Sequence, residues 1–173
     1  VSCFIAQQYP ECKVVGVDKN EAAVNNAKEL AERLGLANAE FVTADIYDFN
    51  LDEKAEVATS FRGLLDIAQR QTSGVSVIGE RSAREGAYQQ AFLPLATAIG
   101  NNLKDGGTVI SVERYTAMYG WLGWMQALAE NGICPIVEQC ARMVAQDISS
   151  AKDYSVTFAQ KNCNASPIEA YNY

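Results

Sequence analysis

The sequence contains no histidine among its 173 residues. This absence removes the Ser-His and Cys-His nucleophile systems and the commonest general base near neutral pH. Any acid-base chemistry would therefore use Asp, Glu, Tyr, Lys or Cys side chains. Cysteine is sparse, and no C-x-x-C pair occurs among Cys3, Cys12, Cys134, Cys140 and Cys163. With no histidine to complete a mixed site, these thiols predict no metal centre and fit free cysteines in a reducing cytosol.

Long apolar runs and clusters of basic residues are also lacking. No run approaches the roughly 18 to 20 apolar residues that cross a bilayer, so we expect a soluble, cytoplasmic protein without membrane attachment. Lys and Arg number 14 against 21 Asp and Glu, for a net charge of -7, and the basic residues are scattered. Because nucleic-acid affinity requires clustered Lys and Arg, nucleic acid is not expected as a partner. Small molecules or proteins are the expected partners, and a homo-oligomer remains open.

The chain does contain enough apolar residues, 49% of the total, for one substantial core. Hydrophobic patterning predicts strands at 13–17, 39–44, 56–61 and 108–113, separated by helices at about 20–34, 88–103 and 117–130. Two last strands, at about 136–144 and 154–160, alternate well enough to form an antiparallel pair. Residues 69–86 lack periodicity and predict a long loop or mobile lid with some helix.

This alternation of strands and helices predicts an α/β fold, a three-layer sandwich with a mainly parallel sheet and a C-terminal antiparallel hairpin. Ligands in such sheets bind at the carboxyl ends of the strands. That rule selects three features, which are Asp18, Asp45 and the turn Phe61-Arg62-Gly63.

Two aspartates follow neighbouring strands and are separated by one helix. Asp18 can accept hydrogen bonds from the vicinal hydroxyls of a ribose, although it can equally be a turn residue before the Asn20 helix cap. Asp45 can accept a hydrogen bond from an exocyclic amine such as that of adenine, although Asp is also common where a loop begins. Together the pair outlines a site for a nucleoside.

The segment VVGVDKNEAAVNNAKELAERLGLANAEFVTADIYDF, at residues 14–49, resembles the second-strand to third-strand unit of class I (Rossmann-like) S-adenosylmethionine-dependent methyltransferases. LKDGGTVISVE, at 103–113, is similar to the turn and fifth strand of that family, and the terminal hairpin matches as well. The resemblance implies a methyltransferase domain over residues 1–161, with an exposed tail over 162–173. Its cofactor would be S-adenosylmethionine, and its acceptor a small molecule or a protein.

The resemblance also implies roles for individual residues. Asp18 would bind the ribose hydroxyls and Lys19 would flank the adenine. Asp45 and the backbone N–H of Ile46 would contact the adenine edge. Ser60, Phe61 and Arg62 would lie where the fourth strand opens onto the methionine moiety and the acceptor.

Some of these residues have ordinary structural alternatives. Arg62 could clamp an acidic substrate or the cofactor carboxylate, or simply pair with a nearby carboxylate at the strand end. Tyr115, Tyr119, Trp121 and Trp124 could line an acceptor pocket, or could belong to the core. No catalytic residue stands out, which is compatible with methyl transfer because in-line displacement can proceed by proximity and orientation alone.

The sequence departs from the family at its start. The first strand and the acidic, glycine-rich turn of the family should precede VSCFIAQQYP, and no such turn is present, so we expect an N-terminally incomplete domain. Two alternatives therefore remain. One is a degenerate, non-catalytic methyltransferase-like interaction domain. The other is a nicotinamide-dinucleotide-binding Rossmann domain, which also places an acid after its second strand, although no Tyr-x-x-x-Lys pair occurs downstream of Asp18.

Overall fold

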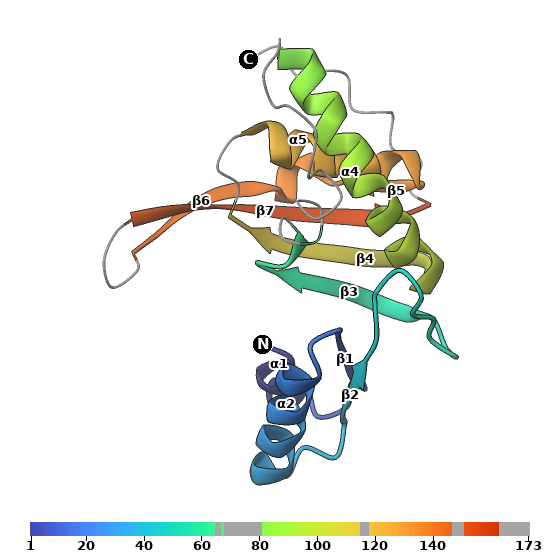
Figure 1. Cartoon of the computed structure of the whole chain (residues 1–173), viewed down its shortest axis with the longest axis vertical. Helices are drawn as coiled ribbons and strands as arrows, with labels where there is room; N and C mark the ends of the chain where they lie inside the picture. Colours follow the sequence, from blue (N-terminus) through green and yellow to red (C-terminus); the bar gives the residue numbers. More distant parts are fainter. Residues whose placement is uncertain (65–66, 68–80, 115–117, 147–150, 163–173) are drawn as a thin grey trace. The chain divides into compact units, whose positions relative to one another are not determined.

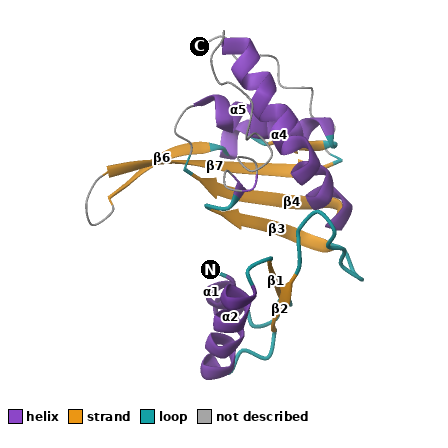
Figure 2. Cartoon of the chain, viewed as in Figure 1, coloured by secondary structure: helices purple, strands orange, loops and turns teal. Residues whose placement is uncertain are grey.

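A computed structural model of the chain describes residues 1–64, 67, 81–114, 118–146 and 151–162. The chain divides into two compact units, Val1–Phe49 and Asn50–Tyr173, which are considered separately below (Figures 1 and 2). Within the described residues, no helix is both long and apolar enough to span a membrane. Among the described cysteines, Cys3, Cys12 and Cys140 are free thiols.

The first unit is a two-stranded parallel sheet with two helices. Its elements are α1 Ser2–Gln8, β1 Val14–Asp18, α2 Glu21–Leu34 and β2 Ala39–Thr43. β1 pairs with β2 from Val14–Ala39 through to Asp18–Thr43. The Asn20 side chain accepts from two backbone N–H groups at the start of α2, and Gly35 ends the helix in the left-handed region at φ 67°. The predicted strand, capped helix and strand are confirmed here.

One amide group closes the C-terminal end of α1. Asn38 Nδ2 lies within hydrogen-bond distance of the carbonyl oxygens of Ala6, Tyr9 and Cys12, at 3.0, 3.2 and 2.9 Å. Ala6 lies in the last turn of α1, where the helix supplies no backbone donor, and Tyr9 and Cys12 belong to the turn that follows, in which the Tyr9 carbonyl oxygen also accepts from the Cys12 N–H at 3.1 Å. Asn38 also leads directly into β2, and it therefore ties α1 to the sheet.

The second unit is a five-stranded mixed sheet with two long helices. Its elements are β3 Ala55–Phe61, α4 Arg81–Asn102, β4 Leu103–Glu113, α5 Met118–Glu130, β5 Ile133–Pro135, a 3-10 turn Val137–Gln139, β6 Ala141–Gln146 and β7 Ala151–Lys161. The strand order is β3-β4-β7-β5, with β6 also paired to β7. β3 and β4 are parallel, whereas β7 is antiparallel to each of its neighbours.

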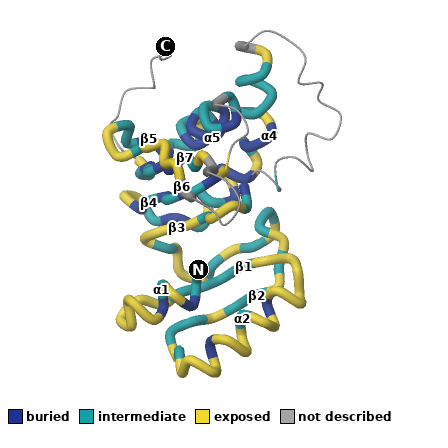
Figure 3. Tube along the Cα trace, turned by 90° about the vertical axis from the view of Figure 1, so that its left-hand side faces the viewer, coloured by how far each residue is buried: buried dark blue, intermediate teal, exposed yellow. Residues whose placement is uncertain are grey.

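The core of this unit lies between α4, α5 and the sheet, where the buried residues of Figure 3 gather. Phe92 of α4 and Trp124 of α5 are both 0% exposed and meet edge to face, with 5.5 Å between ring centroids. Such a contact stabilises by about 0.5 to 1.5 kcal/mol beyond the burial of apolar area. The aromatic pair thus joins the two helices.

The boundaries around α4 differ from those predicted. α4 begins at Arg81, so residues 81–86 are helical, while the rest of the predicted loop at 69–86 lies outside the described residues. Leu103 belongs to β4 instead of to the helix, because it is fully buried and pairs with Ala55. Residues 104–107 then form a bulge that shifts the register, with Gly106 at a φ of 77°, before pairing resumes between Thr108 and Val57. The turn at residues 104–107 is therefore present where the sequence predicts it, but it lies within β4.

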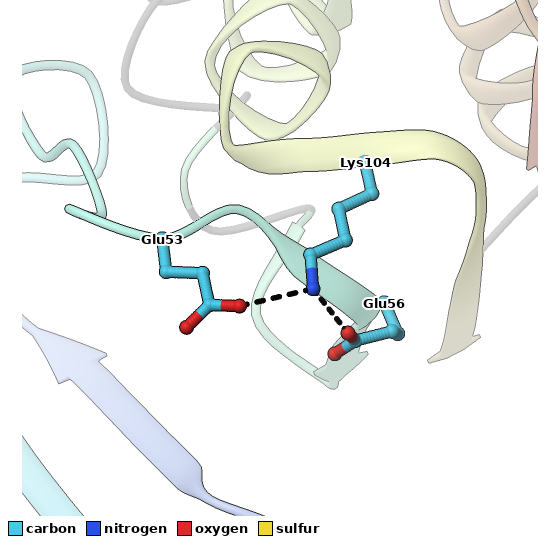
Figure 4. Close-up of polar contacts among 3 residues, drawn as sticks. All are labelled: Glu53, Glu56 and Lys104. Carbon is cyan, nitrogen blue, oxygen red and sulfur yellow. Dashed lines mark hydrogen bonds and ion pairs between the residues drawn. The ribbon is translucent and has the colours of Figure 1, made fainter.

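Lys104 lies in this bulge and contacts two acidic side chains, one before β3 and one within it. Its ammonium contacts Glu53 at 3.2 Å and also Glu56 (Figure 4). The hydrogen bond from Lys104 lowers the pKa of the Glu56 carboxyl. All three groups lie at the amino end of β3. The two glutamates are well exposed and Lys104 is half-buried, so they form a surface cluster and no part of the ligand-binding edge.

The predicted strand at 136–144 covers the 3-10 turn and the first four residues of β6, and the short strand β5 precedes it at 133–135. β5 pairs with residues 159–161 of β7, and β6 pairs with residues 151–156 of the same strand. β7 has 11 residues and is long enough to pair with both, and after Pro135 the Ile136 N–H still donates to the Phe158 carbonyl oxygen of β7 at 2.7 Å. The antiparallel hairpin is confirmed. The predicted tail lies outside the described residues beyond Asn162, which is exposed.

Candidate functional site

In the first unit, Asp18 and Asp45 come to the same edge of the parallel sheet. Asp18 ends β1 and pairs with Thr43, the last residue of β2. The Ala44 N–H donates to the Asp18 carbonyl oxygen at 3.1 Å, so Asp45 follows one residue after this bond. Both aspartates are exposed to solvent. The two carboxylates selected from the sequence therefore belong to neighbouring strand ends.

The local contacts of the two carboxylates leave acceptor capacity for a ligand. Asp18 Oδ1 accepts from the Asn20 N–H at 2.8 Å, and Asp45 Oδ1 accepts from the Tyr47 N–H at 3.1 Å. Within the described part of the chain, no contact engages Oδ2 of either residue, and a carboxylate can accept about four hydrogen bonds. Asp18 is thus a turn residue through one oxygen and remains able to accept from a hydroxyl through the other. Lys19 is exposed and Ile46 is half-buried beside them.

In the second unit, the carboxyl end of β3 carries Phe61 and Arg62. Phe61 is 42% exposed. Arg62 is also exposed and has a φ of 61°, the left-handed region that a residue with a Cβ enters at a cost of roughly 1 to 2 kcal/mol. Its N–H donates to the Val112 carbonyl oxygen at 2.9 Å. Among the described residues Arg62 forms no ion pair, and Tyr115 lies outside them.

Glu113, the last residue of β4, lies next to this strand end and is only 1% exposed. Its Oε1 accepts from the Ser60 hydroxyl at 2.9 Å and from the Gly63 N–H at 3.2 Å. Burial raises the pKa of the Glu113 carboxyl, against the opposing effects of the Ser60 hydroxyl and the backbone N–H groups at 62–64. Sequence reasoning missed this residue. The feature of the sequence that could have indicated it is the position of an acidic residue at the end of an otherwise largely apolar strand.

The two tryptophans of α5 each donate a hydrogen bond to a strand of the sheet. Trp124 is fully buried, and its Nε1–H donates to Ser111 Oγ at 3.0 Å. Trp121 is half-buried and donates through Nε1–H to Thr157 Oγ1 at 2.8 Å. The alternative that these side chains belong to the core is correct for Trp124. Tyr119 stays half-buried, with the Arg84 guanidinium 5.6 Å from its ring centroid.

Comparison with known families identifies the chain. A family described as "Methyltransferase domain" matches residues 1–166, so the chain belongs to the methyltransferase domain family. No curated protein matches the sequence. The resemblance noted from residues 14–49 and 103–113 is thereby confirmed, and S-adenosylmethionine is the cofactor of such methyltransferases.

Solved structures give the same fold. An antibiotic-resistance methyltransferase, Kmr, superimposes with a TM-score of 0.67 at 14% identity, covering 95% of this chain and 82% of its own. A methyltransferase of Methanosarcina mazei gives 0.66 at 14% identity, covering 93% and 86%. The N-methyltransferase NodS of Bradyrhizobium japonicum WM9, in complex with S-adenosylhomocysteine, gives 0.59 at 13% identity, covering 92% and 72%. The predicted Rossmann-like α/β class is confirmed.

The residues of the first unit fit such a cofactor. A ribose offers two vicinal hydroxyl donors and an adenine offers an exocyclic amine, and the exposed carboxylates at the ends of β1 and β2 can accept both kinds of hydrogen bond. This edge presents no arginine or lysine cluster for phosphates, since Lys19 is its one basic side chain over residues 17–20 and 43–47. The donor and acceptor set therefore suits a nucleoside without phosphates.

Proposed function

We propose that this protein is an active S-adenosylmethionine-dependent methyltransferase whose acceptor is a small molecule or a protein. The observation that carries the proposal is the placement of Asp18 and Asp45 at adjacent ends of parallel strands, each with an unengaged carboxylate oxygen among the described contacts. This is where nucleotide-binding α/β sheets place their acidic ribose ligand. The family match over residues 1–166 supports the same assignment.

In the first unit, Asp18 accepts hydrogen bonds from the ribose hydroxyls, and Lys19 flanks the adenine. Asp45 and the Ile46 N–H bind the exocyclic amine and ring nitrogen of adenine. Because Asn20 already fixes Oδ1 of Asp18, the carboxylate is oriented before the ligand arrives. Such preorganisation reduces the entropy lost on binding.

In the second unit, we assign Phe61 to the methionine moiety, with Arg62 and Tyr115 on the acceptor side. The cofactor, when bound, supplies an electrophilic methyl group on a sulfonium. The chain then has to align the acceptor atom behind that methyl group and exclude water, which needs orientation and no dedicated base. An arginine on the acceptor side favours a substrate with an anionic group.

Isothermal titration calorimetry of the wild-type protein with S-adenosylhomocysteine, S-adenosylmethionine and NADH tests this function. We expect saturable binding of the first two and none of NADH. Binding of NADH alone would support the dinucleotide-binding alternative. Binding of S-adenosylhomocysteine with no transfer of labelled methyl groups to any candidate small-molecule or protein acceptor would favour the non-catalytic alternative.

A further inference from the structure

Glu113 occupies a position that is costly for a carboxyl group. It is 1% exposed at the carboxyl end of β4, in the interior of the second unit. Removing a carboxylate from water costs free energy unless hydrogen bonds replace the lost hydration. Here those bonds come from the neighbouring strand end, through the Ser60 hydroxyl and the Gly63 N–H. The Glu113 carboxyl group therefore stabilises the turn that follows β3.

That turn is strained at Arg62, one of the two residues between the donors Ser60 and Gly63. Arg62 has a φ of 61°, although its side chain makes the left-handed region unfavourable. Strain of this kind persists where the surroundings fix it, and it concentrates at functional sites. The surroundings that fix Arg62 are its own N–H bond to Val112 and the Gly63 N–H bond to Glu113. Both acceptors lie at the end of β4.

Two hydrogen bonds of the carboxyl group, from the Ser60 hydroxyl and from the Gly63 N–H, end on the same atom, Oε1. A glutamine side chain also has an oxygen at this position and can accept from the same two donors. Alanine has none, and it would leave the Gly63 N–H without its partner. The two substitutions therefore separate the hydrogen bonds of Glu113 from its charge.

We propose that Glu113 is a positioning residue of the cofactor site, which holds the turn Ser60-Phe61-Arg62-Gly63 in the conformation that binds S-adenosylmethionine. It contacts the turn and no ligand. This role rests on the proposed function, because the turn is useful only if Phe61 contacts the cofactor. It adds a residue to the site that lies 50 positions from Gly63 along the chain.

The test compares three variants with the wild-type protein. Glu113→Ala removes the acceptor, Glu113→Gln keeps it, and Ser111→Ala is a matched control. Ser111 lies two residues earlier in β4, is equally buried and bonds Trp124 instead of the turn. Two quantities are measured for each protein: the dissociation constant for S-adenosylhomocysteine by calorimetry, and the amide hydrogen exchange rate of Gly63 by NMR.

For Glu113→Ala we expect about tenfold weaker binding and about tenfold faster exchange at Gly63, because a misplaced binding group loses most of its contribution. Glu113→Gln should remain within about threefold of wild type in both, since it retains the acceptor. Ser111→Ala should lower the melting temperature without changing either quantity at this turn. A purely structural role would make the affinity of Ser111→Ala fall as far as that of Glu113→Ala.

Each outcome decides one point. Unchanged exchange at Gly63 in Glu113→Ala overturns the anchoring of the turn, whatever the ligand does. Faster exchange with unchanged affinity overturns the positioning role alone. Absence of S-adenosylhomocysteine binding in the wild-type protein contradicts the proposed function and with it the role assigned to Glu113 in cofactor binding, while the exchange rates still decide whether Glu113 anchors the turn.

Discussion

Asp18 and Ala44 are joined by a backbone hydrogen bond of 3.1 Å, in which the Ala44 N–H donates to the Asp18 carbonyl oxygen. This bond extends the parallel pairing of β1 and β2 to the point where both strands end. Asp45 leaves the sheet one residue later. The bond is therefore the reason that two carboxylates 27 residues apart along the chain share one edge, and it makes their common use by one ligand physically reasonable.

Replacing Asn38 should destabilise the first unit. Asn38→Ala removes the donor shared by three carbonyl oxygens in the last turn of α1 and in the turn that follows it, and we expect a loss of about 1 to 3 kcal/mol in the free energy of unfolding. Asn38→Asp should cost more than Asn38→Ala above pH 5, because it places an anionic acceptor against those carbonyls. Urea denaturation measures both. An aspartate variant as stable as wild type would show that this amide does not close the helix.

The hydrogen bond between Trp124 and Ser111 should appear as a coupling energy. Ser111→Ala leaves the buried Trp124 N–H unsatisfied, at a cost of about 1 to 3 kcal/mol. Trp124→Phe removes the donor and opens space in the core, so it should cost more. Each single variant loses the same hydrogen bond. The double variant should therefore lose less free energy of unfolding than the two single variants added together, by about 0.5 to 1.5 kcal/mol. Strict additivity would contradict a direct bond.

The raised pKa of Glu113 predicts a pH dependence of stability. Below its ordinary pKa of 4.5 the carboxyl is protonated in both folded and unfolded states. As pH rises from there through the raised folded pKa, the unfolded state loses its proton first, and stability falls. Glu113→Gln lacks this titration, so the stability of the wild type relative to the variant should decline over that range and then level off.

Guanidinium denaturation of both proteins between pH 4 and pH 8 measures this difference, and the other carboxyl groups are common to both and cancel. A difference that stays constant, or that changes in the opposite direction, would falsify the assignment of the raised pKa to burial of Glu113.

The elements of the first unit were predictable because their signals are local. Asn20, the helix period and Gly35 lie within one short segment, and Asp18 is the last residue of its strand. Glu113 was not predictable as a site residue, because its partner Ser60 is 53 residues away and the contact depends on the register of β3 and β4. The short strand β5, which precedes the predicted strand, was missed for a related reason. It pairs with residues 159–161 of β7 whereas β6 pairs with residues 151–156, and no local pattern encodes this division.

The central claim, that the edge formed by Asp18 and Asp45 binds S-adenosylmethionine, is tested most directly by calorimetry with S-adenosylhomocysteine. Glu29→Ala, an exposed acidic residue of α2, serves as the control for charge. Asp18→Asn keeps an acceptor for the Asn20 N–H but loses the negative charge, and Asp18→Ala loses both. We expect Asp18→Ala to weaken binding by about 1 to 3 kcal/mol through loss of a charge-assisted hydrogen bond, and Asp18→Asn to weaken it by less. Wild-type affinity in Asp18→Ala would contradict the account.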